Sequence, residues 1–272
     1  MPAACAVVCG RHHPLRSVRV PEVPRKQRHQ LPVDAGPAGV DGELAAVRSF
    51  YSRVLSDPEE LRAAAAGGGH FIAIEGEGDL GAVASSVAAG LCRHGLEVIL
   101  SREPGGTPGA AAIGQLLGAS ARWDWGPATT LLLLAAQRLD HLQKTVIPAL
   151  KEGVWVVCER YVGESIVQLG FGRGLGADVV LRLHHQTAGG FMPDLTFVVT
   201  GSVAASPDHG PDGRILEGYL ALRELIGALP VAPEGPVRET AAIILDQIER
   251  HIGLPPLAPQ GMGKAFRRPP DT

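Results

Sequence analysis

The sequence predicts an α/β fold in which a doubly wound parallel sheet is flanked by helices. Short apolar runs that suit buried strands alternate with longer amphipathic segments from residue 71 to residue 252. Strands that are separated by helices pair in parallel, because each helix returns the chain to the end of the sheet at which the previous strand began. Hydrophobic residues make up 45% of the 272-residue chain, which is enough for the core that such a layered domain requires.

Four strands and three helical regions are expected. The strand candidates are short runs rich in Val, Ile, Leu and Phe, and they span residues 71–75, 97–101, 154–158 and 195–200. The helical candidates have apolar residues three and four positions apart. They span residues 82–94, residues 128–152 as one or two helices, and the region from Arg214 onward.

The segments outside this region differ in composition. Residues 1–40 are rich in Pro, Arg and His, and we expect either a disordered arm or translated sequence upstream of the true start codon. Residues 41–69 have the spacing of an amphipathic helix that ends in a glycine joint. Residues 70–253 then form the predicted folded domain, and the Pro-rich residues 254–272 are expected to be a disordered tail.

The net charge, the hydropathy and the cysteine content of the chain indicate which partners and which cellular compartment to expect. The net charge of −3 argues against nucleic acid or an anionic membrane as the main partner. No run of 18 apolar residues is present, so no membrane span is expected. Cys92 and Cys158 lie in apolar surroundings typical of free thiols, which favours a cytoplasmic protein. Four residues near the start of the chain are of types that can bind a metal ion: Cys5, Cys9, His12 and His13. They could instead lie near one another by chance, and we expect no metal site there.

Three segments, in order, carry a resemblance to a known family. They read Phe-Ile-Ala-Ile-Glu-Gly (71–76), Ser-Arg-Glu-Pro-Gly-Gly-Thr-Pro (101–108) and Val-Val-Cys-Glu-Arg-Tyr (156–161). Taken alone, the second could be a tight turn, because Pro-Gly-Gly is common in loops. Together the segments resemble bacterial-type thymidylate kinases, and this resemblance implies the P-loop nucleoside-monophosphate kinase fold. Shorter matches lie at 135–138 with His141, 172–175, 190–196 and 217–220.

The loop after the first strand departs from the family pattern. A working phosphate loop needs glycines, a Lys that reaches the phosphates and a Ser or Thr for Mg²⁺. The resemblance places Gly76 and Gly81 at the two glycine positions, but Ala82 stands where the Lys belongs and Val83 where the Ser or Thr belongs. The segment 200–213, where the resemblance implies a basic lid, is short and contains a single histidine as its basic residue. The sequence therefore predicts a degenerate phosphate loop and a shortened lid.

The resemblance also implies roles on the acceptor side. Arg138 would contact the pyrimidine base, Arg160 the monophosphate or a metal, and Arg102 would shape the phosphate pocket. In an active enzyme, Glu159 and Arg160 would hold the metal and the acceptor phosphate, and Glu75 would be the acid near the chemistry. From the residues alone, Arg138 and Arg160 could instead be structural, with Arg138 a solvated helix residue.

Three functional hypotheses follow. The first is a thymidylate-kinase-like pseudokinase that retains part of a nucleoside-monophosphate site but lacks a competent ATP loop. The second is an active kinase that transfers phosphate from ATP to dTMP or a related nucleotide, and Mg²⁺ and ATP are cofactors only in this case. The third is a purely structural subunit that pairs with an intact kinase paralogue. As partners we expect a nucleoside monophosphate and either a second copy of the chain or a paralogue. The sequence favours the first and third, because the losses fall on the catalytic positions while the strand cores persist.

Overall fold

The structure is a computed structural model, and it describes residues 67–119, 124–200, 213–232, 235–259 and 263–269. All of them belong to one compact unit, residues 47–272. The expected arm at 1–40 and the expected helix that precedes the glycine joint lie outside the described residues.

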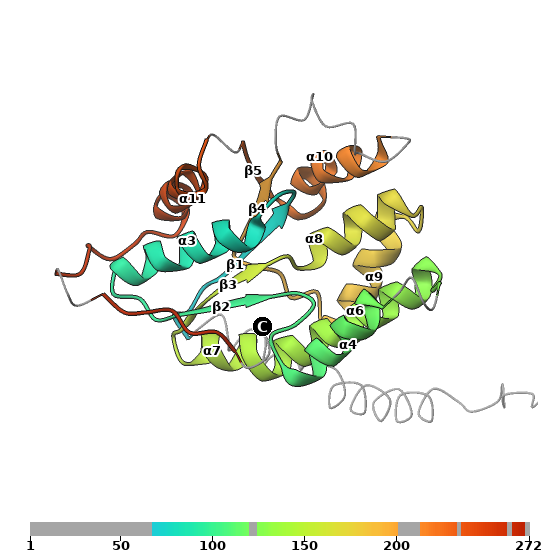
Figure 1. Cartoon of the computed structure of the whole chain (residues 1–272), viewed down its shortest axis with the longest axis horizontal. Coiled ribbons are helices and arrows are strands. Elements are labelled where there is room, and N and C mark those ends of the chain that lie inside the picture. Colours follow the sequence, from blue (N-terminus) through green and yellow to red (C-terminus); the bar gives the residue numbers. More distant parts are fainter. Residues whose placement is uncertain (1–66, 120–123, 201–212, 233–234, 260–262, 270–272) are drawn as a thin grey trace, which may run out of the picture. The chain divides into compact units, whose positions relative to one another are not determined.

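The centre of the unit is a five-stranded parallel sheet with the strand order β2-β3-β1-β4-β5 (Figure 1). The four predicted strands are confirmed within one or two residues. The fifth was missed, because it is only three residues long and contains a proline. The strands are β1 (Phe71–Gly76), β2 (Val98–Arg102), β3 (Trp155–Glu159), β4 (Leu195–Val199) and β5 (Leu229–Val231).

Helices cover both faces of the sheet (Figure 1). On one face, α3 (Leu80–Arg93) packs against α11 (Val237–His251). The elements associated with the other face are α4 (Pro108–Gly118), α6 (Pro127–His141), α7 (Ile147–Lys151), α8 (Val162–Ser165), α9 (Ala177–Ala188), α10 (Arg214–Ile226), and the π-helical segments Leu142–Val146 and Ile166–Gly172. Among the described residues, no helix is both long and apolar enough to cross a membrane.

The two layers bury two hydrophobic clusters, and β1 contributes to both. Successive side chains of a strand point to opposite faces of the sheet. Phe71 and Ala73 accordingly join one cluster, while Ile72 and Ile74 join the other. This central strand is fully buried, as expected for the middle of a parallel sheet that is covered on both sides.

Helix α4 was not predicted from the sequence. Its glycines lower helix propensity, and its first residues follow a Pro-Gly-Gly run that favours a turn. The helix begins because the Thr107 side chain accepts a hydrogen bond from the Ala110 N–H at 3.0 Å, and Pro108 occupies the first turn. The cap at the N-terminus of the helix thus compensates for the low helix propensity of its sequence.

The expectation of a disordered tail is wrong for the described part of residues 254–272. The Leu100 N–H donates to the Arg267 carbonyl at 2.8 Å, and the Arg267 N–H donates to the Val98 carbonyl at 2.9 Å. Strand β2 is the edge of the sheet, and its outer N–H and C=O groups need partners. The tail supplies them, and Phe266 packs against the cluster that contains α3 and α11.

Substitution Arg267→Pro is expected to open this edge. Proline lacks the N–H that reaches Val98, so hydrogen exchange at the Leu100 amide should become faster by at least about tenfold. Amide exchange followed by mass spectrometry measures this. Arg268→Pro is the matched control, because Arg268 takes no part in the pairing and a following proline favours extended backbone at residue 267. Equal exchange in the two variants would show that the tail does not protect β2.

Candidate functional site

Glu75 lies at the carboxyl end of β1 and is completely buried. Its carboxyl oxygens accept three backbone hydrogen bonds around the start of α8, from Tyr161 at 3.0 Å, Gly163 at 2.9 Å and Glu164 at 3.1 Å. A Cβ added at Gly163 would lie 2.6 Å from the Glu75 Oε1. The close approach therefore requires glycine, and it ties the central strand to α8.

Burial raises the pKa of Glu75 to about 8, and the nearby Glu164 carboxylate acts in the same direction. The Arg138 guanidinium and the Gly163 N–H act in the opposite direction. The folded protein therefore holds a proton at Glu75 over a pH range in which an exposed glutamate is ionised.

This shift predicts a specific pH dependence of stability. Between 4.5 and about 8 the folded state binds more protons at Glu75 than the unfolded state, so the free energy of unfolding falls as pH rises through this window. Between pH 6.5 and 8, we expect the wild type to lose about 1.6 kcal/mol more than Glu75→Gln does. Urea unfolding at both pH values measures the difference. Parallel pH profiles for the two proteins would contradict the assignment.

The loop after β1 begins at Gly76, which has φ +125°. A Cβ at this position would lie 1.9 Å from the Val199 carbonyl oxygen, and the same oxygen accepts a hydrogen bond from the Glu77 N–H at 2.9 Å. Only glycine fits this backbone. The glycine that the sequence singled out is thus required by the junction between β1 and β4.

Carboxylates surround the start of α3, where the loop ends. The Asp79 Oδ1 accepts a hydrogen bond from the Ala82 N–H at 3.0 Å. A Cβ built on Gly81 would lie 3.1 Å from the Glu159 Oε2 and 3.7 Å from the Asp79 Oδ1. A helix N-terminus attracts anions through its free N–H groups and its dipole. Here the chain supplies anionic groups of its own.

A cavity of about 230 Å³ borders this loop. Its lining offers carboxylates and apolar groups, and the lining includes Glu77, Gly78, Asp79, Val83, Val199, Gly235, Val237 and Thr240. Positions 76–83 contain no Lys or Arg.

Arg160 follows β3 in a left-handed conformation, with φ +62°. This conformation is uncommon for a residue with a side chain, and it is held here by the hydrogen bond from the Arg160 N–H to the Ile74 carbonyl at 2.9 Å. The guanidinium lies between two carboxylates. Its Nη1 is 3.4 Å from the Glu159 Oε1, and its Nε is 3.7 Å from the Glu164 Oε1.

Arg138 lies in a buried polar network on α6. Its Nε donates to the Glu103 carboxylate at 2.9 Å, and its Nη2 donates to the Ser165 hydroxyl at 2.9 Å. Gln137 and His141 also contact Glu103, at 2.9 and 3.2 Å. Burial acts to raise the pKa of Glu103, but the Arg138 and His141 groups hold it below its usual value. Arg138 is 3% exposed, so it is not a solvated helix residue.

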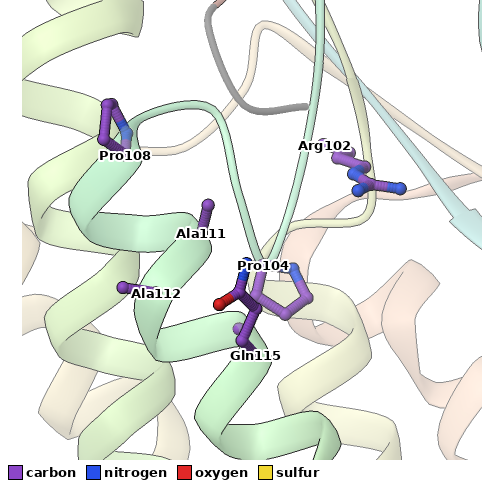
Figure 2. Close-up of a pocket in the computed structure, with 7 residues that line it drawn as sticks. Arg102, Pro104, Pro108, Ala111, Ala112 and Gln115 are labelled. Carbon is purple, nitrogen blue, oxygen red and sulfur yellow. The ribbon is translucent and has the colours of Figure 1, made fainter.

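Arg138 and Arg160 border the same cavity, which has a volume of about 260 Å³. Arg102 instead borders a separate cavity of about 650 Å³, formed by the end of β2, the segment that follows it and α4. Figure 2 shows Arg102 and Pro104 together with the α4 residues of this second cavity. The structure thus brings two of the three predicted arginines together. The smaller cavity is lined by Glu103, Pro104, Thr130, Leu134, Arg138, Arg160, Tyr161, Glu164, Ser165, Gln168 and Leu169.

Sequence reasoning missed several site residues. Glu103 stands inside a quoted motif, and its position between Arg102 and a proline was the available signal. Glu164 gave no signal, because a single carboxylate after a strand is most often solvated. His184 on α9 is also buried, and burial lowers its pKa to about 4. Among the described residues, no group of three or more His, Cys, Asp or Glu side chains is arranged to hold a metal ion.

Comparisons with known proteins agree with this architecture. The sequence profile of a family described as thymidylate kinase matches residues 82–206. A thymidylate kinase of Alkalilimnicola ehrlichii is 39% identical over 174 residues, which are 57% of this chain and 80% of that protein. A thymidylate kinase of Rhizorhabdus wittichii is 41% identical over 133 residues, which are 48% of this chain and 64% of that protein, slightly less than two thirds of its length.

A solved structure is also similar in fold. The crystal structure of a thymidylate kinase from Ehrlichia chaffeensis superimposes with a TM-score of 0.57 at 22% identity, over 67% of this chain and 99% of that one. The predicted fold class is therefore confirmed.

Proposed function

This chain belongs to the thymidylate kinase family, and we propose that it is a pseudokinase that retains part of a nucleoside-monophosphate site but lacks a phosphate loop able to hold ATP. The observation that carries the proposal is the hydrogen bond from the Ala82 N–H to Asp79. The Asp79 carboxylate thus accepts from a backbone N–H at the start of α3 that a bound phosphate would need as a hydrogen-bond donor.

The charge of the loop supports the same conclusion. Transfer of a phosphoryl group depends on positive charge and N–H donors around the phosphates, and loss of one donor costs roughly 10²–10³ in rate. Neither Ala82 nor Val83 can supply a cation or a metal-binding hydroxyl. Glu77 and Asp79 add two negative charges beside the cavity at the start of α3. Gly76 and Gly81 are then remnants of the loop that keep its backbone path.

The acceptor side supports retention of a small-molecule site. Arg138 is fixed by Glu103 and Ser165, and Arg160 is held in a strained backbone conformation beside it. Strain of this kind costs about 1–3 kcal/mol and is concentrated at binding sites. We propose that Arg138 contacts the base and that Arg160 lies nearest the ribose and phosphate. Arg102 contributes only from the neighbouring cavity.

Two titrations and one rate measurement test the proposal. Calorimetry with Mg²⁺–ATP is expected to give no heat of binding, and calorimetry with dTMP and with thymidine tests the acceptor side. A coupled assay for ADP release, with dTMP as acceptor, is expected to give no signal above background. The Alkalilimnicola ehrlichii thymidylate kinase is the positive control for the assay. Release of ADP by this chain would reject the pseudokinase and favour the active kinase, with Glu75, Glu159 and Arg160 at the reacting groups and Mg²⁺ as cofactor.

A second candidate role, pairing with another copy of this chain, is favoured by one surface. Helices α4 and α6 pack side by side and leave Leu116 and Leu132 exposed, Leu132 by 60%. Large exposed leucines on adjacent helices are suited to an isologous dimer contact. Leu132→Asp is expected to give a monomer in light scattering, whereas the matched control Leu220→Asp, on α10 and also 60% exposed, should not change the mass. A monomeric wild type would reject the dimer.

A further inference from the structure

The acceptor-side cavity has an electrostatic feature that bears on its ligand. We propose that the Glu164 carboxylate takes the place of a ligand phosphate beside Arg160, so that the cavity selects an uncharged nucleoside over the corresponding monophosphate. This inference rests on the proposed function, because it specifies which part of a nucleoside-monophosphate site is retained.

The first step is the position of the carboxylate. The Glu164 Oε1 lies 3.7 Å from the Arg160 Nε, and the Glu159 Oε1 lies 3.4 Å from the Arg160 Nη1. One guanidinium is thus shared by two carboxylates of the chain. All three side chains are mostly buried, at 35% exposure or less, so water screens these charges only partly.

The second step is that Glu164 is fixed in place. Its backbone N–H donates to Glu75, and its Oε2 lies 3.2 Å from the Tyr219 hydroxyl, which shares its one proton between this oxygen and the Gly76 carbonyl at 3.1 Å. The Gln168 side chain also forms a hydrogen bond with it. A carboxylate with this many partners cannot swing away from Arg160 without breaking them, so it remains beside the guanidinium when a ligand enters.

The third step is the charge that a phosphate would meet. The acidic and basic side chains that line this cavity, among the described residues, are two glutamates and two arginines. Arg138 already pairs with Glu103, and Arg160 pairs with Glu164 and with Glu159 outside the lining. No positive charge in this set is left over for a phosphate dianion. Burial raises the pKa of Glu164 while the Arg160 guanidinium lowers it, and in the ionised form Glu164 repels a phosphate together with Glu159.

The same surroundings suit a neutral ligand. The Arg160 Nε is buried and has no hydrogen-bond partner among the described residues, and its distance from Glu164 exceeds a hydrogen bond. A sugar hydroxyl can accept from this N–H without bringing charge. Leu134 and Leu169 add apolar wall, and Ser165 adds a hydroxyl for the edge of a base.

Calorimetry with thymidine and dTMP tests the proposal on the wild type, on Glu164→Gln and on Glu249→Gln, an exposed control on α11. We expect the wild type and the control to bind thymidine at least about tenfold more tightly than dTMP. Glu164→Gln should gain at least about tenfold in affinity for dTMP, while its affinity for thymidine changes by less than about threefold. Gln keeps an oxygen that accepts from Tyr219, so the cavity should retain its shape.

The outcomes separate this inference from the function on which it rests. If the wild type binds dTMP as tightly as it binds thymidine, the inference is overturned and the retained monophosphate site stands. If neither ligand binds to the wild type or to Glu164→Gln, the proposed acceptor site fails and the inference fails with it. If Glu164→Gln does not fold, the wild-type comparison of the two ligands still decides the question.

Discussion

Replacement of Arg138 by alanine is expected to lower the free energy of unfolding by about 3–5 kcal/mol. Arg138 is the charged partner of Glu103, and both side chains are 3% exposed. Removal of the guanidinium leaves a buried carboxylate without its main counter-charge, and such a group is far more costly than the pair itself is stabilising. Equilibrium unfolding in urea, followed by circular dichroism, gives the difference directly.

The matched control is Arg182→Ala, because Arg182 forms an ion pair with Asp178 on α9 that is 66% exposed on both sides. Exposed pairs contribute only about 0–1 kcal/mol, so this variant should be nearly as stable as the wild type. The double variant Arg138→Met/Glu103→Leu should regain much of the stability lost in Arg138→Ala, because it removes the uncompensated charge. An equal and small effect of the two single alanine substitutions would show that Glu103 does not depend on Arg138.

The parts of the fold that could be predicted are those with a strong local signal. The first four strands are apolar runs bounded by turn residues, and their order along the chain implied a parallel sheet. Strand β5 and helix α4 lack such a signal, since β5 has three residues and α4 contains two internal glycines. The tail is Pro-rich, and its order comes from pairing with the edge of β2, which lies far away in sequence.

The candidate site likewise contains residues that a local sequence signal identified and residues that it did not. Glu75 and Gly76 were found because a motif places them, and the structure shows why the backbone there needs a glycine. The Glu103–Arg138 pair joins residues 35 positions apart, and no periodicity connects them. Glu164 becomes significant only through its distance from Arg160. The charge balance in a cavity depends on contacts between helices and strands. Tertiary packing determines these contacts, and the local sequence pattern therefore does not reveal them.

Reconstruction of the phosphate loop is expected to have the largest effect on ligand binding. The double variant Ala82→Lys/Val83→Thr supplies the residue types that the loop lacks. Asp79 would still accept the hydrogen bond from the N–H of residue 82 and would attract the new lysine. We therefore expect the double variant to bind Mg²⁺–ATP weakly. Addition of Asp79→Gly should increase the affinity by at least about tenfold, because it frees the start of α3 for a phosphate.

Asp79→Asn in the same double variant distinguishes two effects of Asp79, the repulsion of phosphate by its negative charge and its hydrogen bond with the N–H of residue 82. An asparagine oxygen can still accept from the N–H of residue 82 but carries no charge. If repulsion is the main obstacle, the asparagine variant should bind Mg²⁺–ATP as tightly as the glycine variant. If occupancy of the N–H is the obstacle, it should bind as weakly as the variant that keeps Asp79. Calorimetry on all four proteins, the wild type included, decides between these. Binding of Mg²⁺–ATP to the wild type with the affinity of the glycine variant would mean that the carboxylates at the start of α3 do not exclude the nucleotide, and the pseudokinase would have to be abandoned.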